Sequence, residues 1–254
     1  MTQVEEPAPT TRRERQREAT FAEIVRASRE LLTEGVELSL RAVAAKMGLT
    51  APALYRYVAS YQELVDLVAY EVDRSATERF AAAADTMPAD DPAGRLLMAV
   101  TEFRMWALAN PREFSIVFAN PIADSNCMRR EMLTLSSSGH LFTDLIFEVW
   151  QATDFEIPEL DELPAAIQES IRDPLIPAKV ERIPVDRRGL VWVYMQGWTQ
   201  LYGVVTLEAM AHMDPRVIES GEMFIDVARN YAPRIGLADD WPRLEALVRK
   251  RLAG

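Results

Sequence analysis

Apolar residues recur at helical spacing along most of this 254-residue chain. Between residues 39 and 47, Leu40, Val43, Ala44 and Met47 stand at positions i, i+3, i+4 and i+7, which is one face of a helix. No sustained alternation of Val, Ile and Thr, the pattern typical of strands, interrupts this spacing. The pattern therefore predicts an all-α protein.

Proline, glycine and asparagine divide this pattern into separate helices. Gly35 is expected to end the first helix, and Asp214-Pro215 to separate two late ones. The proline-rich stretch 153–185 predicts a surface loop with one short helix near 164–172. The other expected helices span 61–85, 92–109, 111–119, 128–155, 187–213, 215–231 and 241–252.

The stretch from Ser39 to Leu64 has the pattern of a helix-turn-helix. Gly48 suits the tight turn after the first helix, and Thr50 is a good N-cap for a second helix over 51–58. Leu54 and Val58 point inward on this second helix, which leaves Pro52, Ala53, Tyr55, Arg56 and Tyr57 facing outward. Small residues, phenols and an arginine on one face are typical of a helix that enters the major groove. A capping box over 60–63 is expected to start the next helix.

The order of these residues resembles the DNA-binding domain of the tetracycline-repressor (TetR) family of bacterial regulators. The resemblance covers roughly residues 15–75, and the alternative is a plain αα-hairpin in a helical enzyme. It implies DNA contacts by the outward-facing residues and by Arg41, with Tyr61 standing where the family usually has Lys. The implied DNA-binding residues are Arg41, Thr50, Ala51, Pro52, Ala53, Tyr55, Arg56, Tyr57 and Tyr61.

Two structured domains are therefore expected after a disordered tail. Residues 1–11 are rich in Pro, Thr and Glu and offer nothing to bury. Residues 12–60 are expected to form the helix-turn-helix domain, preceded by a basic arm of Arg12, Arg13, Arg15 and Arg17. Residues 61–254 are expected to form a helical effector-binding and dimerisation domain. The helix that begins at Tyr61 would join the two mechanically.

The distribution of charge agrees with this division. The chain carries a net charge of −11, but residues 10–60 hold nine Lys and Arg against six acids. Positive charge is thus confined to the proposed DNA-binding end, where phosphates would be met.

A second resemblance lies in the C-terminal half. Trp198, Tyr202-Gly203 and Leu207-Glu208 are similar to the signature of one TetR subgroup, whose regulatory domain carries Trp and then His-Gly on a late helix. In this chain Tyr202 stands at the position of that His. Any role of the His imidazole in the subgroup therefore does not apply here.

The resemblance also implies an effector pocket in the larger domain. Aromatic residues concentrate between 103 and 198, and a filled aromatic core is the alternative interpretation. Tyr194, Gln196 and Gln200 are further polar candidates for orienting a ligand. The proposed ligand-binding residues are Phe103, Arg104, Trp106, Phe114, Phe118, Phe142, Ile146, Trp150, Trp198 and Tyr202.

The helices over 187–213 and 215–231 are too apolar for elements with one face in water. We expect them to pair with the same helices of a second copy in a two-fold four-helix bundle. The expected interface residues of this homodimer are Val191, Tyr194, Leu201, Val205, Phe224, Val227 and Ala228.

The chain offers little material for catalysis. It has a single cysteine, Cys127, and two histidines, His140 and His212, without surrounding acids, so neither a metal site nor a cofactor is indicated. An enzyme using Glu148, Glu208 and His212 is the weakest alternative. No signal peptide or membrane span is indicated, and a cytoplasmic location is expected.

These patterns together predict a DNA-binding transcriptional repressor, released from double-stranded operator DNA by a small, largely apolar effector. A DNA-binding architectural factor without an effector is the alternative, and a cavity in the larger domain would distinguish the two.

Overall fold

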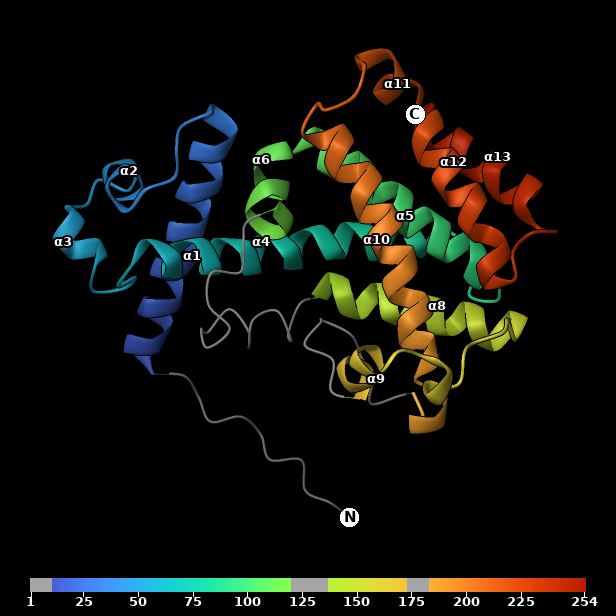
Figure 1. The fold of residues 1–254 in the computed structure, drawn as a ribbon. Coiled ribbons are helices and arrows are strands. Elements are labelled where there is room, and N and C mark those ends of the chain that lie inside the picture. Colours follow the sequence, from blue (N-terminus) through green and yellow to red (C-terminus); the bar gives the residue numbers. More distant parts are fainter. Residues whose placement is uncertain (1–10, 120–136, 173–182) are drawn as a thin grey trace. The chain divides into compact units, whose positions relative to one another are not determined.

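The computed structural model describes residues 11–119, 137–172 and 183–254. Within these ranges every regular element is a helix (Figure 1), which confirms the all-α fold class. The chain divides into two compact units, residues 1–68 and 69–254. The smaller unit includes the first two turns of α4 (Tyr61–Ala84), where Leu64, Val65 and Val68 are buried, so it extends beyond the expected boundary at residue 60. The predicted disorder of residues 1–10 lies outside the described residues.

Three helices precede α4 in the smaller unit. They are α1 (Arg12–Glu34), α2 (Leu40–Lys46) and α3 (Ala51–Leu54), and α2 packs against both of the others. Gly35 follows α1 with φ of 80°, as the expected helix stop requires. Ser39 caps α2, since its hydroxyl accepts a hydrogen bond of 3.2 Å from the Ala42 N–H.

The turn between α2 and α3 is built at Gly48, which has φ of 68°. The Leu49 N–H donates to the Ala44 carbonyl at 2.8 Å and closes the end of α2. Thr50 is the N-cap residue of α3, as expected, but its hydroxyl makes no capping bond. Its backbone carbonyl instead accepts from the N–H groups of Ala53 and Leu54 at 2.9 and 3.2 Å.

The α-helical part of α3 ends at Leu54, earlier than the expected residue 58. The reason is that the Tyr57 N–H donates to Leu54 only three residues back, which tightens the chain into a turn. The expected capping box before α4 is formed in part, because Glu63 bonds to the residue before the N-cap Ser60. Ser60 Oγ accepts from the Glu63 N–H at 3.1 Å, and the Glu63 carboxylate accepts from the Ala59 N–H at 2.6 Å.

The larger unit is built around α5 (Pro92–Ala109), which packs most extensively against three other helices. These are α8 (Ser137–Thr153), α10 (Gly189–Ala209) and α13 (Trp241–Leu252). Two short elements lie against the larger ones: α6 (Pro111–Phe114), which continues into the π-turn Ser115–Ala119, and α9 (Ala165–Arg172). The expected start of α8 at residue 128 lies outside the described residues.

The expected single helix over 215–231 is two helices, α11 (Pro215–Ser220) and α12 (Glu222–Tyr231). Gly221 lies between them with φ of 67°, a left-handed conformation that an α-helix cannot contain. The short 3₁₀ turn Ala232–Ile235 follows α12. Among the described helices, none combines the length and the apolar character needed to cross a membrane.

Candidate DNA-binding surface and ligand cavity

Two exposed arginines stand at the ends of the helix-turn-helix. Arg41 lies in the first turn of α2, and Arg56 in the turn after α3. Within the described part of the chain neither forms an ion pair or a hydrogen bond, so both guanidinium groups are available to a ligand. Lys46, by contrast, is held by Glu34 at 2.6 Å and by Glu30 at 3.5 Å. The unpaired positive charge of the motif therefore lies at Arg41 and Arg56.

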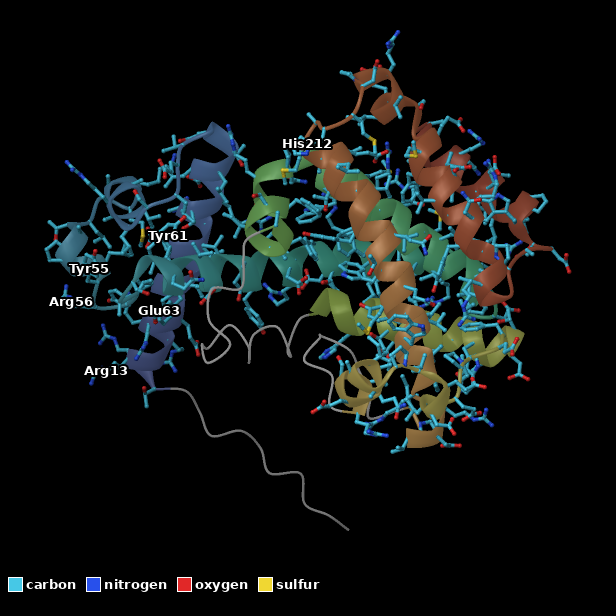
Figure 2. All side chains as sticks on the ribbon, in the orientation of Figure 1. Arg13, Tyr55, Arg56, Tyr61, Glu63 and His212 are labelled. Carbon is cyan, nitrogen blue, oxygen red and sulfur yellow. The ribbon has the colours of Figure 1, made fainter. Side chains whose placement is uncertain are left out.

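The other predicted DNA contacts differ in exposure. Tyr55 and Tyr61 are 52% and 53% exposed, and Tyr55 and Arg56 project outward in Figure 2. Thr50 and Pro52 are exposed, whereas Ala51 and Ala53 are half-buried. Tyr57 is also half-buried, because its ring packs edge-on against Phe21 at a centroid distance of 6.2 Å. Tyr57 thus has a packing role that its position in the motif did not indicate.

The basic arm begins α1. Arg12 and Arg13 are exposed, while the Arg17 guanidinium lies 5.4 Å from the Phe21 ring centroid. Phe21 therefore contacts both Arg17 and Tyr57, which ties the start of α1 to the turn after α3.

Most of the predicted ligand-binding aromatics form one cluster of contacting rings. Phe103 of α5 is fully buried, and its ring centroid lies 5.3 Å from that of Phe118 and 5.6 Å from that of Trp198. Trp106, Phe114 and Tyr202 extend the same cluster. The Tyr202 hydroxyl donates to the Phe118 carbonyl at 2.8 Å and so has an internal partner. Trp150 packs against Phe147 instead. The cavity described below is not lined by Phe103, Trp106, Phe114, Phe118, Trp150 or Tyr202, so their assignment to a ligand pocket stays a prediction.

Phe80 of α4 is the central residue that the sequence interpretation missed. It is fully buried, and its ring contacts those of Phe103, Trp106 and Phe142 at 5.6 to 6.0 Å. Its spacing from Val72 and Ala76 continues the apolar face of α4, so the helical pattern contained the information needed to find it.

Arg104, which was also assigned to the ligand pocket, belongs to a buried ion pair. Its Nε lies 2.6 Å from the carboxylate of Glu208 on α10, and both side chains are at most 5% exposed. Its Nη2 donates to the Ile218 carbonyl of α11 at 2.6 Å. Burial raises the pKa of Glu208, and the hydrogen bond from Arg104 opposes that rise. One Glu208 oxygen, Oε1, is buried without a hydrogen-bond partner.

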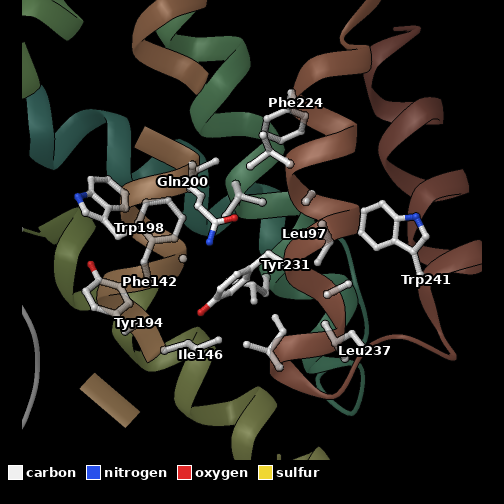
Figure 3. A pocket seen from close by; sticks show the side chains of 18 residues that line it. Leu97, Phe142, Ile146, Tyr194, Trp198, Gln200, Phe224, Tyr231, Leu237 and Trp241 are labelled. Atoms are coloured by element: carbon white, nitrogen blue, oxygen red, sulfur yellow. The ribbon is translucent and has the colours of Figure 1, made fainter. Parts of the chain in front are cut away.

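A cavity of about 100 Å³ lies between α5, α8, α10 and α12 (Figure 3). Of the predicted ligand-binding residues, Phe142, Ile146 and Trp198 line it. The other walls include Leu97, Phe224 and Tyr231, which were not assigned to the pocket. The residues that line the cavity come from several separate helices and share no sequence motif. Sequence spacing alone therefore did not indicate that they meet.

The predicted dimer-interface residues fall into two groups. Val191, Val205 and Phe224 are at most 1% exposed within the single chain, so these three are not accessible to a second copy. Their assignment is wrong, because Val191 and Val205 on α10 and Phe224 on α12 are buried within their own unit. Tyr194, Leu201, Val227 and Ala228 line the cavity and are half-buried.

The residues of the enzyme alternative have other roles or positions. Glu208 pairs with Arg104, Glu148 lies 3.5 Å from Arg95, and His212 is exposed after α10 (Figure 2). Among the described residues there is no group of three or more His, Cys, Asp or Glu side chains that suits a metal ion.

Comparison with known proteins gives partial matches, and no family model matches the chain. It is 32% identical over 106 residues to the HTH-type transcriptional regulator Rv1816 of Mycobacterium tuberculosis. It has the same identity to the HTH-type transcriptional regulator Mb1846 of Mycobacterium bovis. The match spans 41% of this chain and 44% of each relative, which is less than half of their length.

A solved structure resembles most of the chain. The crystal structure of SCO4313, described as a putative regulatory protein, superposes with a TM-score of 0.54 at 22% identity, over 91% of this chain and 98% of that one. At this identity the likeness concerns the fold.

Proposed function

We propose that this protein is a sequence-specific DNA-binding transcriptional regulator of the TetR type, with a regulatory domain of the Trp-His-Gly subgroup. The observation that carries the proposal is the pair of exposed, unpaired arginines that flank the small residues of α3. Arginine can donate two parallel hydrogen bonds to guanine. The methyl group of alanine and the ring methylenes of proline can make apolar contacts with thymine methyl groups. The relatives named as HTH-type transcriptional regulators support the same class.

The experiment that tests this proposal is enrichment of a random duplex library on the purified protein at moderate salt. We expect a pseudo-palindromic consensus whose two halves are a helical turn, or a multiple of it, apart. Enrichment without any consensus would remove sequence-specific DNA binding from the proposal.

Arg41→Ala is expected to weaken binding to the enriched site by about 1–3 kcal/mol, because one base contact is lost. Lys46→Ala is the matched control, since it removes the same charge from the same helix but from a side chain that glutamates already hold. Fluorescence anisotropy with the consensus and with single-base variants measures both effects. The role of Arg41 fails if both variants lose the same affinity for every duplex.

We propose a homodimer formed through the outer faces of α10 and α12. Gly203 stands in the middle of α10, and a Cβ atom at this position would meet nothing within 4 Å. A mid-helix glycine costs about 1 kcal/mol relative to alanine, and nothing inside the chain requires it here. Leu207 and Met223, 42% and 41% exposed, lie on the same two helices. These observations favour close approach of a second helix.

Replacing both Leu207 and Met223 by Glu is expected to split the dimer, since burying two unpaired carboxylates per chain is unfavourable. Operator binding should be lost with it, because a single reading head contacts only half of the site. Light scattering measures the mass, which should fall to 28.7 kDa. Val36→Glu, at a site of 43% exposure in the other unit, is the control. A wild-type mass near 28.7 kDa at micromolar concentration would contradict the dimer.

We further propose that the regulator is a repressor that a small apolar molecule releases from its operator. The cavity between α5, α8, α10 and α12 favours this over an architectural factor, whose core has no reason to leave such a space. An effector acts here only through its different affinity for the two conformations of the dimer.

A further inference from the structure

We propose that the cavity between α5, α8, α10 and α12 binds an uncharged molecule of about one aromatic ring, and that Tyr231 sets its size limit. The cavity adjoins the aromatic cluster around Phe103, with which it shares Phe142 and Trp198. The inference rests on the proposed function only in treating this molecule as an effector.

The charge of the lining determines the charge of the ligand. All 18 side chains around the cavity (Figure 3) are uncharged, and most are aliphatic or aromatic. A carboxylate or ammonium group inside would lose its hydration without gaining a counter-ion, which is strongly unfavourable. The cavity therefore disfavours binding of charged ligands and accepts neutral ones.

The polar groups of the lining are largely occupied by internal partners. The Tyr231 hydroxyl donates to the Val193 carbonyl, and Trp241 Nε1 donates to Glu245 at 2.7 Å. The Tyr194 hydroxyl is hydrogen-bonded to Thr143, although burial still raises its pKa. Gln200 is exposed, and within the described residues its amide has no hydrogen-bond partner. A ligand can thus place one polar substituent at Gln200 and must be apolar elsewhere.

The volume and the Tyr231 ring limit the size of the ligand. A cavity of about 100 Å³ is of the order that accepts a benzene-sized molecule. Tyr231 lies directly against α10, because a Cβ atom on Gly197 would come within 2.8 Å of its ring. Because Gly197 has no side chain, the Tyr231 ring can pack directly against α10, and the cavity beside the ring stays open.

Occupancy of the cavity acts on the helices proposed to form the dimer. The cavity lies between α10 and α12, so a ligand there fixes the spacing of the two. Phe224, on the wall, also lies 5.5 Å from the Arg104 guanidinium, which holds α10 and α11 through Glu208 and Ile218. Ligand binding would thus bias the arrangement of α10, α11 and α12.

The test compares ligands of one ring and different charge on the full chain without DNA. Toluene and phenol are expected to bind in calorimetry and raise the melting temperature, whereas benzoate and benzylammonium bind at least tenfold more weakly. Ala228→Leu, which fills the cavity, should abolish toluene binding, and Ala246→Leu, at an exposed position of α13, should not.

Gln200→Glu provides a test that does not depend on repacking, because Gln200 is exposed. It should shift the preference toward benzylammonium over benzoate by tenfold or more. The inference is overturned if neither toluene nor phenol binds up to its solubility limit. It is also overturned if benzoate binds as tightly as toluene, or if Ala228→Leu leaves toluene binding unchanged. These outcomes are independent of the duplex enrichment, so the ligand and the DNA proposals fail separately.

Discussion

Replacing Arg104 by Met is expected to destabilise the larger unit by about 3–5 kcal/mol. The change leaves Glu208, whose side chain is fully buried, without its cation. It also removes the donor to the Ile218 carbonyl, which joins α5 to α11. Chemical denaturation followed by tryptophan fluorescence measures this unit alone, because all five tryptophans lie after residue 69.

The double variant Arg104→Met with Glu208→Leu separates a lost charge pair from lost packing. Replacing both partners by apolar residues removes the unpaired charge, so most of the stability should return. If the double variant is no more stable than the single one, the ion pair is not the cause of the loss.

The effect of the single variant should depend on pH. Without Arg104 the pKa of buried Glu208 rises further above its unfolded value, so the folded chain takes up a proton. Its stability then falls as the pH rises above about 4.3, and the loss should be larger at pH 8 than at pH 5.

Phe103→Ala is expected to cost about 3–5 kcal/mol, because it empties the centre of a packed aromatic cluster. The ring contacts five others, those of Phe80, Phe114, Phe118, Phe142 and Trp198, at centroid distances of 5.3 to 6.0 Å. Since these neighbours come from several helices, they cannot all move into the space that is left. The same fluorescence-detected denaturation measures the loss.

Phe147→Ala is the matched control, because this half-buried ring lies outside the cluster and packs against Trp150. It should cost clearly less than Phe103→Ala. Equal costs would mean that the aromatic cluster around Phe103 is loosely packed, and the site would again be a candidate ligand pocket.

Local chemistry made the helix-turn-helix predictable from the sequence. Glycine adopts positive φ readily, and a residue with positive φ ends a helix. Gly35 and Gly48 both have positive φ and end helices here. Ser39, Ser60 and Glu63 cap helices through groups at most four residues away. Arg41 and Arg56 are exposed because the apolar face of the motif lies on the other side. Each of these features depends on neighbours close in sequence, which a pattern of spacing records.

The interior of the larger unit depended on contacts between distant residues. Aromatic content did not distinguish a filled core from a pocket, because that depends on how α4, α5, α8 and α10 pack together. Phe80 closes the cluster around Phe103, and the cavity lies beside it, against α12. Arg104 and Glu208 lie 104 residues apart in the sequence. Considered one at a time, they were candidates for a ligand contact and a catalytic acid. In the folded chain they form a buried ion pair. Helical spacing determines which face of each helix is apolar, but only tertiary packing decides which faces meet and where they leave space.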